Sequence, residues 1–578
     1  MTFSAIRSIA GSALSASQLS MQVSSANIAN ADTEGYSRKS VVQSASVTGG
    51  SGSGVAVTAI SANVDKYLLA DLLAAASALG SATTMASFAN SLQAQLGNTS
   101  GLDDTGTSLA ATITALQTAL SSLSGTPESD TLKGLALSAL DAVASQLRET
   151  SSSVQGLRSD ADHQIEDSVG TVNSALEQIA DLNKQIVAAK ARGDSAADLE
   201  DQRNAALKSI TGLMDVSYYV TSRGEMRIST SSGTTLLDSS VHTISYSAAA
   251  TAATGTVFSA IAVDGKDITG EIKSGTIGAL INQRDNVLPA TQSELDTLAA
   301  QLILAVNTLS NTGTASPPPS GLTGSASVAA ADALDATGTT RVAVTDSDGN
   351  LVSYEDIDLS TLSTVGDLVD ALNAVPGISA SISSAGKLVI SATDSTQGIA
   401  LGEIDASVGT ANAGLSAYFG LNDLLAGTSA TDISVRKDVL SSSSLFPVSA
   451  LDTSATLTAG EPALPTSAGL AQDLSALFSA GQSFAWAGSI GSITTTFADY
   501  AAKLVGNAAT RAAGAQTAEA SKQSAYDALS ASLSSASGVN LDEETARISE
   551  LQQLYSTAAQ LFEVLNAMFE ALLSAAKS

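Results

Sequence analysis

The C-terminal stretch of the chain, residues 537–577, carries its most regular hydrophobic pattern. Apolar residues recur there at steps of three and four positions, as along the contact face of a coiled coil. The stripe consists of Leu551, Tyr555, Ala558, Phe562, Leu565, Phe569 and Leu572. Asn540 precedes the stripe as an expected N-cap, and Glu543 lies three residues after Asn540, the spacing of a capping box. The pattern therefore predicts one long helix that begins near Asn540.

A second helical pattern lies at the other end of the chain, from Phe3 to Asn30. Leu14, Met21 and Ile28 lie one heptad apart, and small residues between them would let another helix approach closely. Ordering a residue costs about 1–2 kcal/mol, whereas burying one large apolar side chain returns about 1.5–3 kcal/mol. A lone helix with such a narrow stripe is marginal, so we expect the two terminal helices to pair. The residues expected to make contacts are Ile6, Leu14, Met21 and Ile28 on the first helix and the C-terminal stripe on the second.

The segment after the first helix is rich in residues that break helices. We expect Asn27, Asn30, Gly35 and Tyr36 to shape a turn there. Alternating apolar positions over 41–47 and 55–59, around a tip rich in glycine and serine, predict a β-hairpin. The tip lacks the Lys-Ser/Thr ending of a phosphate-binding loop, so we interpret it as a turn.

The middle of the chain alternates between helical and strand patterns. Three-four spacing predicts helices over 67–123 and 129–190, and again over 276–309, where Pro289 is expected to kink or split the helix. Asn183 falls on an apolar stripe, and two interpretations stay open: it fixes the register of a helix contact, or it faces solvent. Alternation after Met214 predicts strands, with a hairpin over 216–228.

The insert after Pro317–Pro319 shows an α+β pattern. Residues 341–354 predict a hairpin around Asp346–Asn350, Thr364 begins a short capped helix, and 378–390 form a second hairpin. The carboxylates of the first turn are similar to those of a calcium loop. Glycine at the fourth position and the missing closing glutamate favour a simple turn.

These patterns predict a multidomain fold with a mainly α trunk and small β-rich and α+β inserted domains. Residues 1–66 with 537–578 would form the paired terminal helices and a short hairpin. The helical trunk, a long bundle or coiled coil, would comprise 67–214, 276–313, 416–440 and 470–536. Residues 215–275 would be a β-rich domain, 316–415 the inserted domain, and 441–469 a linker.

Composition narrows the classes of function. A chain of 578 residues is too long for one core. Its net charge of −30 argues against nucleic acid, whose phosphates it would repel. Cysteine is absent from the sequence, which excludes disulfides and thiolate metal sites. We see neither a signal peptide at the N-terminus nor a run of about twenty apolar residues that would cross a membrane.

Candidate chemistry is sparse. The two histidines, His163 and His242, lie far apart in the sequence and have no ligand spacing around them. A Gly-x-Ser-x-Gly elbow is missing, and the acidic residues are scattered along helix faces. We therefore predict that the protein is not an enzyme and has no catalytic, cofactor-binding or metal-binding residues.

Three stretches resemble a known family. Asn27–Arg38, followed by Val64–Tyr67, resembles the N-terminus of flagellar axial proteins, and its Gly-Tyr-Ser-Arg ending resembles the FlgK family of hook-associated proteins more than rod or hook proteins. Ser537–Glu544 is similar to the C-terminal signature of that family, and Asp198–Asn204 is similar to another of its segments. Ala62–Val64 departs from the family, which often has an arginine there.

The resemblance implies a secreted structural subunit of the bacterial flagellum, exported unfolded through the type III channel and assembled outside the cell at the hook–filament junction. The implied partners are copies of itself in a ring-like or helical homo-oligomer, the hook protein, the next hook-associated protein and an export chaperone. Neither nucleic acid nor membrane insertion is expected. The alternatives are a flagellar hook or rod protein, or a secreted adhesin or surface-layer protein. A rod-associated peptidoglycan hydrolase would need a catalytic domain, and the sequence shows no motif of one.

Overall fold

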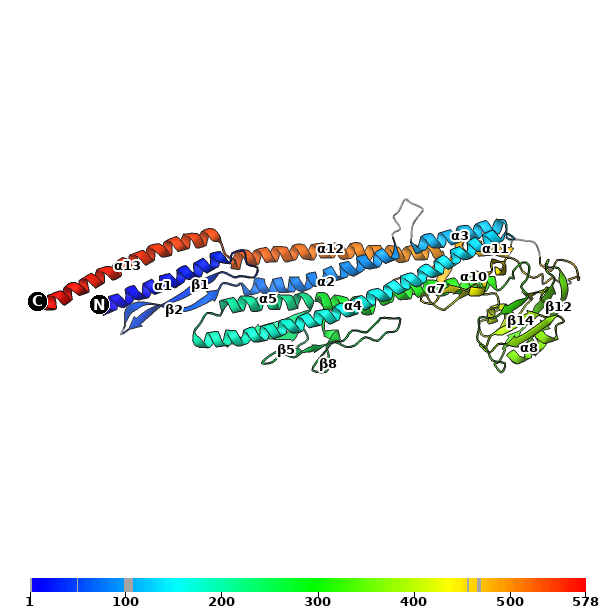
Figure 1. Cartoon of the computed structure of the whole chain (residues 1–578), viewed down its shortest axis with the longest axis horizontal. Helices are drawn as coiled ribbons and strands as arrows, with labels where there is room; N and C mark the ends of the chain where they lie inside the picture. The colour runs from blue at the N-terminus through cyan, green and yellow to red at the C-terminus, as the bar shows by residue number, and fades with distance from the viewer. Residues whose placement is uncertain (1–2, 49, 98–107, 455–456, 465–468, 578) are drawn as a thin grey trace. The chain divides into compact units, whose positions relative to one another are not determined.

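Long helices and small antiparallel sheets make up the computed structural model of the chain (Figure 1). The structure describes residues 3–48, 50–97, 108–454, 457–464 and 469–577. It divides into two compact units, one formed by Met1–Phe88, Arg158–Asp285 and Ala513–Ser578, the other by Ala89–Leu157 and Asn286–Ala512. The predicted fold class, a mainly α protein with small β-containing inserts, is confirmed.

The first unit contains both termini. Its elements are α1 (Phe3–Ala29), β1 (Lys39–Thr48), β2 (Ser51–Ala62), α5 (Ala197–Leu213), β3 (Val216–Val220), β4 (Met226–Thr230), β5 (Thr235–Leu237), β6 (Ile244–Ser245), β7 (Ala262–Val263), β8 (Lys266–Asp267), α6 (Gly275–Asn282) and α13 (Leu541–Lys577). The helices α2 (Lys66–Leu96), α4 (Asp130–Arg192) and α12 (Phe497–Ser537) contribute residues to both units.

The predicted beginning of the last helix is confirmed. Asn540 Oδ1 accepts hydrogen bonds from the backbone N–H groups of Asp542 and Glu543, at 3.0 and 3.2 Å. Acidic residues fill the first turn, where they complement the positive end of the helix dipole. The Glu543 carboxylate, expected to complete a capping box, instead lies 3.1 Å from the Arg38 guanidinium.

The hairpin predicted after Met214 is confirmed as β3 and β4, which join β5 in a three-stranded antiparallel sheet. Asn183 of α4 is buried against this sheet. Its side-chain N–H donates to the Met226 carbonyl at 2.8 Å, and its Oδ1 accepts from the Met226 N–H at 2.9 Å. Asn183 therefore fixes a strand to the helix, and the interpretation that it faces solvent is wrong.

The second unit consists of helices, the insert and a small hairpin. Its elements are α3 (Leu109–Gly125), α7 (Leu288–Ser310), β9 (Gly321–Thr323), β10 (Ala336–Thr337), β11 (Thr339–Thr345), β12 (Leu351–Asp358), α8 (Val365–Ala374), β13 (Ile378–Ile382), β14 (Leu388–Ala392), β15 (Gly398–Glu403), β16 (Ser407–Val408), α9 (Leu415–Phe419), β17 (Leu425–Ala426), β18 (Ser434–Val435), α10 (Lys437–Ser441), α11 (Gly469–Ser479), β19 (Gln482–Phe484) and β20 (Ile493–Thr495).

Two predicted helices are interrupted. The helix expected over 67–123 consists of α2 and α3, and residues 98–107 between them lie outside the described residues. The helix expected over 276–309 is split, as predicted. A π-helical turn, Gln283–Val287, separates α6 from α7, and Pro289 occupies the first turn of α7, where the missing N–H costs nothing.

The insert has its own core. Its two sheets, β12–β11–β15 and β13–β14–β9, and helix α8 share one cluster of buried apolar residues. Thr364 forms the predicted cap of α8, with a complete capping box to Asp367. The Asp346 carboxylate accepts from the backbone N–H groups of Asp348 and Asn350, as in a hairpin turn.

A chain segment expected as linker covers this sheet. Leu451, Ala463 and Leu464 pack on Ala343 and Ala400 of β11 and β15. The Leu351 N–H donates to the Glu461 carbonyl at 2.8 Å, and the Arg341 guanidinium donates to the Ser454 carbonyl at 2.8 Å. The described part of residues 451–464 is thus bound to the insert by both apolar and polar contacts.

Candidate functional site

The two terminal helices, α1 and α13, lie side by side in the first unit (Figure 1). They run antiparallel, because the base of α13 lies near the end of α1 while the Arg7 guanidinium lies 5.5 Å from the ring centroid of Phe562. Helix α13 is the longer of the two and extends past the start of α1 (Figure 1). The pairing of the chain ends inferred from the sequence is therefore present in the structure.

Small residues form the buried side of α1. Ala10, Ala16, Ser20 and Ser24 are buried, whereas the predicted contact residues Ile6, Leu14, Met21 and Ile28 are only partly buried. The small side chains let the β1–β2 hairpin approach the helix. Ser12 shows how close this approach is, since its Oγ accepts a hydrogen bond from the Val55 N–H at 3.1 Å.

The apolar stripe of α13 is only partly covered by α1. Leu551 and Leu565 are buried and Phe562 is partly buried, whereas Tyr555 is 39% exposed. Phe569 and Leu572 are 48% and 60% exposed. These last two lie on the C-terminal turns of α13.

A second apolar row on α13, which the sequence analysis missed, is exposed as well. It consists of Leu554, Leu561, Val564 and Met568, which are between 45% and 57% exposed. Leu554, Leu561 and Met568 are spaced one heptad apart, a signal that was present in the sequence. An apolar arc wider than one partner helix covers is typical of a helix with a further packing partner.

The turn after α1 is organised around a buried asparagine. The Asn27 side-chain N–H donates to the Lys39 carbonyl at 2.9 Å, and its Oδ1 accepts from the Lys39 N–H and the Tyr36 hydroxyl, both at 3.0 Å. Asn30 donates to the Ala26 carbonyl at the end of the helix. Gly35 has a positive φ of 79°, which favours glycine. Asn27 thus lies in the last turn of α1 and the other three residues lie in the loop after it, with Asn27 and Tyr36 in direct contact.

Arg38 connects this turn to the base of α13. Its Nε donates to the buried Glu544 carboxylate at 2.7 Å, and its Nη1 donates to Glu543 at 3.1 Å. The Arg38 backbone N–H also donates to the Ser537 carbonyl at 2.7 Å. The Ser537 hydroxyl in turn accepts from the Asp65 N–H at 3.2 Å.

Lys39 connects the same turn to α5. Its ammonium contacts Asp198 at 2.6 Å and Asp201 at 3.0 Å, and lies 3.4 Å from the centroid of the Tyr36 ring. Ser37 donates to Asp201 through both its N–H and its hydroxyl. Burial acts to lower the pKa of Lys39, but the hydrogen bonds and charges of Asp198 and Asp201 outweigh it, and the pKa is raised.

We call this set of residues the joint: Asn27, Tyr36, Ser37, Arg38, Lys39, Asp198, Asp201, Ser537, Glu543 and Glu544. All of them lie in the first unit. Sequence reasoning did not select the charged members as a site. Their signal was indirect, because each lies in or beside one of the three stretches on which the family resemblance rests.

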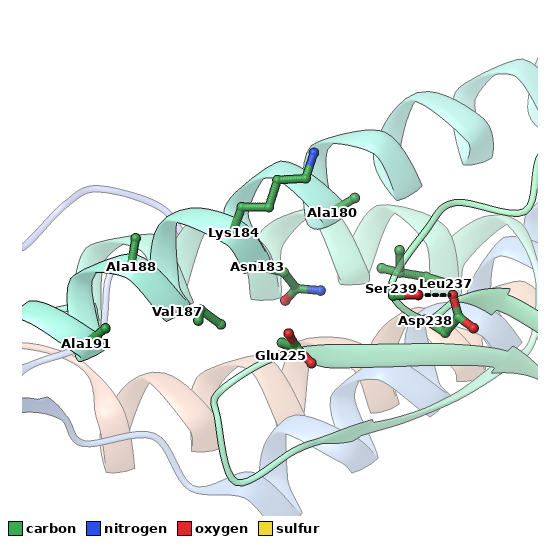
Figure 2. Close-up of a pocket in the computed structure, with 10 residues that line it drawn as sticks. All are labelled: Ala180, Asn183, Lys184, Val187, Ala188, Ala191, Glu225, Leu237, Asp238 and Ser239. Atoms are coloured by element: carbon green, nitrogen blue, oxygen red, sulfur yellow. Dashed lines mark hydrogen bonds between the residues drawn. The ribbon is translucent and has the colours of Figure 1, made fainter.

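The groove beside α4 has a different character. It encloses about 390 Å³ between α4 and the β4–β5 sheet (Figure 2). Ala180, Val187, Ala188 and Ala191 form its helix side, and Asn183 in its floor is already bound to Met226. Within the described residues, no cluster of three or more histidine or acidic side chains could hold a metal ion. Lys184, Glu225, Asp238 and Ser239 complete the lining of the groove.

Helix α2 differs from one expectation. Among the described residues, it is long and apolar enough to meet the length and composition of a membrane span, although the sequence analysis expected no such run. A buried core helix meets the same criterion. Leu72, Leu73, Phe88 and Leu92 of α2 are buried in the structure.

Comparison with known proteins gives matches to three protein families. Residues 8–36 match the flagella basal body rod protein family, 94–322 match the flagellar hook-associated protein FlgK helical domain, and 334–394 match the flagellin hook IN motif. Curated protein sequences gave no match. Among solved structures, the flagellar hook junction protein FlgK from Burkholderia pseudomallei is similar at 18% identity with a TM-score of 0.44, over 80% of this chain and 98% of that chain.

The three matched segments follow one another along the chain. They include α1 at the N-terminal end and part of the insert. The rod protein match covers most of α1 and the turn that carries Asn27 and Tyr36. The helical-domain match covers the Asp198–Asn204 stretch, which resembles FlgK in the sequence. The chain therefore carries a FlgK helical domain, and the three family matches together support the FlgK family of flagellar hook-associated proteins.

Proposed function

We propose that this chain is a structural subunit of the bacterial flagellum that assembles at the hook–filament junction through the uncovered face of its terminal helix pair. The observation that carries the proposal is the exposed row of Leu554, Leu561, Val564 and Met568 on α13. Burying one such side chain returns about 1.5–3 kcal/mol, so packing of this row on a neighbouring helix favours assembly.

The proposed partners are those that the family resemblance implies, and the exposed row on α13 offers a surface for them. Copies of this chain, in a ring-like or helical arrangement, would cover one another's exposed rows. The hook protein and the next hook-associated protein would contact the ring on its two sides. The small residues on the buried side of α1, Ala10, Ala16 and Ser20, bury little apolar area, so the helix pair gains stability when neighbours cover its exposed face.

Export is part of the same proposal. The subunit would leave the cell unfolded through the flagellar type III channel, accompanied inside the cell by a chaperone, and would work outside the cell. Terminal helices with narrow buried stripes suit this route, because the end of α13 far from the joint gains its remaining packing from neighbouring subunits. We assign the subunit a structural role without a reaction.

Electron microscopy of isolated hook–basal bodies that carry a tagged copy tests the location. The tag is expected at the distal end of the hook, as a narrow band between hook and filament. A tag along the whole hook or within the rod would contradict the proposal and would favour the hook or rod alternative. A tag spread over the cell surface would favour an adhesin or surface-layer protein.

A further inference from the structure

Arg38 and Lys39, two consecutive cationic residues of the joint, form ion pairs with two different parts of the chain. Consecutive side chains of an extended chain point to opposite sides; Lys39 is the first residue of β1 and Arg38 directly precedes it. Arg38 contacts Glu543 and Glu544 at the base of α13, whereas Lys39 contacts Asp198 and Asp201 near the start of α5. The N-terminal arm, which we define as residues 27–65, is thereby held between the beginning of α5 and a segment that follows Arg38 by about five hundred residues in the chain.

Each side of the joint holds a charge withdrawn from solvent, whereas Glu543 and Asp198 are exposed. The Lys39 side chain is 6% exposed and that of Glu544 is 1% exposed. A buried charge that loses its partner is strongly destabilising, because the remaining group stays desolvated without compensation. Breaking either contact therefore favours opening of the arm over keeping an unpaired charge inside.

Apolar packing gives the arm little other support. Among the described residues from Asn30 to Asp71, the fully buried side chains are those of Ser37 and Lys39, and no apolar side chain there is buried. The hairpin also packs on α1, where the Val55 N–H donates to Ser12 Oγ at 3.1 Å. Two further polar contacts join the arm to Ser537, one from the Arg38 N–H and one from the Asp65 N–H. The joint therefore supplies the buried side chains among the contacts that hold the arm.

We propose that Arg38 and Lys39 form a two-sided latch, and that the N-terminal arm is ordered only while both sides are closed. One half of the latch is Glu543–Glu544 in the C-terminal part of the chain. The arm therefore closes only after the C-terminal segment has folded beside it. This inference concerns the isolated chain and does not depend on the proposed function.

Hydrogen exchange followed by mass spectrometry on the dilute full-length chain tests the latch. The Glu544→Gln variant keeps the shape of the side chain and removes its charge, and Asp201→Asn does the same on the other side. Each variant is expected to speed exchange of the β1–β2 hairpin amides by about tenfold or more. The amides of α8 and β11 in the second unit should keep their original rates.

Asp194→Asn is the matched control. Asp194 pairs with Arg192 at 2.8 Å in the same unit, and both side chains are more than half exposed. Exposed pairs contribute little, so the control should leave hairpin exchange unchanged. Unchanged hairpin exchange in Glu544→Gln would overturn the proposal. Equal acceleration in the hairpin and in α8 would also overturn it, because the effect would then be global. Assembly is not measured in this experiment, so its outcome stands apart from that of the proposed function.

Discussion

Asparagine side chains on helices hold single strand residues in the same way at several places. Asn27 binds the backbone of Lys39, Asn173 that of Ile244, Asn183 that of Met226 and Asn373 that of Ala380. In each case the amide donates to the carbonyl and accepts from the N–H of one residue, as a neighbouring strand would. The sequence showed that Asn183 interrupts an apolar stripe, but its partner is 43 residues away and the stripe does not identify it.

Replacing Asn183 by alanine should loosen the β3–β4 hairpin from α4. The buried N–H and carbonyl of Met226 would lose their partner, and an unsatisfied buried polar group costs about 1–3 kcal/mol. Hydrogen exchange at the Met226 amide should accelerate accordingly. Gln185→Ala, at an exposed position on the same helix, serves as the control. Equal exchange in both variants would show that the amide contact contributes nothing.

Gly54 is expected to tolerate no side chain. Its φ is +136°, and a Cβ at this position would lie 2.3 Å from Ser12 Oγ of α1. Strained backbone of this kind costs about 1–3 kcal/mol. Gly54→Ala should therefore lower the protection of the hairpin amides against exchange. Gly52→Ala, with no atom near its Cβ, should leave them unchanged; a loss of protection of equal size there would contradict the clash.

His242 should titrate above its ordinary pKa of 6.5. The Asp264 carboxylate, 2.6 Å from Nδ1, is the main cause, with Asp238 on the other side of the ring. A pKa raised in the folded state gives stability that is full below pH 6.5 and is lost as the pH rises through the raised value. Titration of the ring followed by NMR checks this. Asp264→Asn should lower the midpoint, and an unaltered midpoint would show that the contact has no electrostatic effect.

At the level of elements, hydrophobic spacing predicted most helices and hairpins because their signals are local. The cap at Asn540, the capped helix at Thr364 and the split at Pro289 each depend on a few adjacent residues. The joint could not be predicted in this way. Its contacts connect Arg38 with Glu544 and Lys39 with Asp201, residues that are distant in the chain, and neither pair has a spacing pattern.

The terminal helix pair should be least stable at its free end. Near the joint, α1 and α13 are bound to each other and to the hairpin, whereas the last turns of α13 extend past α1. Protection against hydrogen exchange in the dilute monomer should therefore fall along α13 from Leu551 toward Leu572. Strong protection that continues through Leu572 in the monomer would contradict the view that this end waits for a partner.

For the whole molecule, the sequence predicted the protein family better than the surfaces through which the protein would contact its neighbours. The family resemblance rested on three short stretches, and the family matches extend it over the helical region and the insert. The predicted contact residues Phe562, Leu565 and Leu551 lie toward α1 in the structure. The face available to neighbours includes a row that the sequence analysis did not select, because a helix face is assigned only when its partner is known.

A paired substitution on α13 tests the central claim that this exposed row drives assembly. Leu561→Asp places a charge in the row, and Gln560→Asp places the same charge at the adjacent exposed polar position. Each variant is produced in cells that lack the wild-type chain, and filaments and secreted subunits are then counted by electron microscopy and immunoblotting. We predict that Leu561→Asp is secreted but leaves hooks without filaments, whereas Gln560→Asp forms normal filaments. Normal filaments on cells with Leu561→Asp would contradict the account.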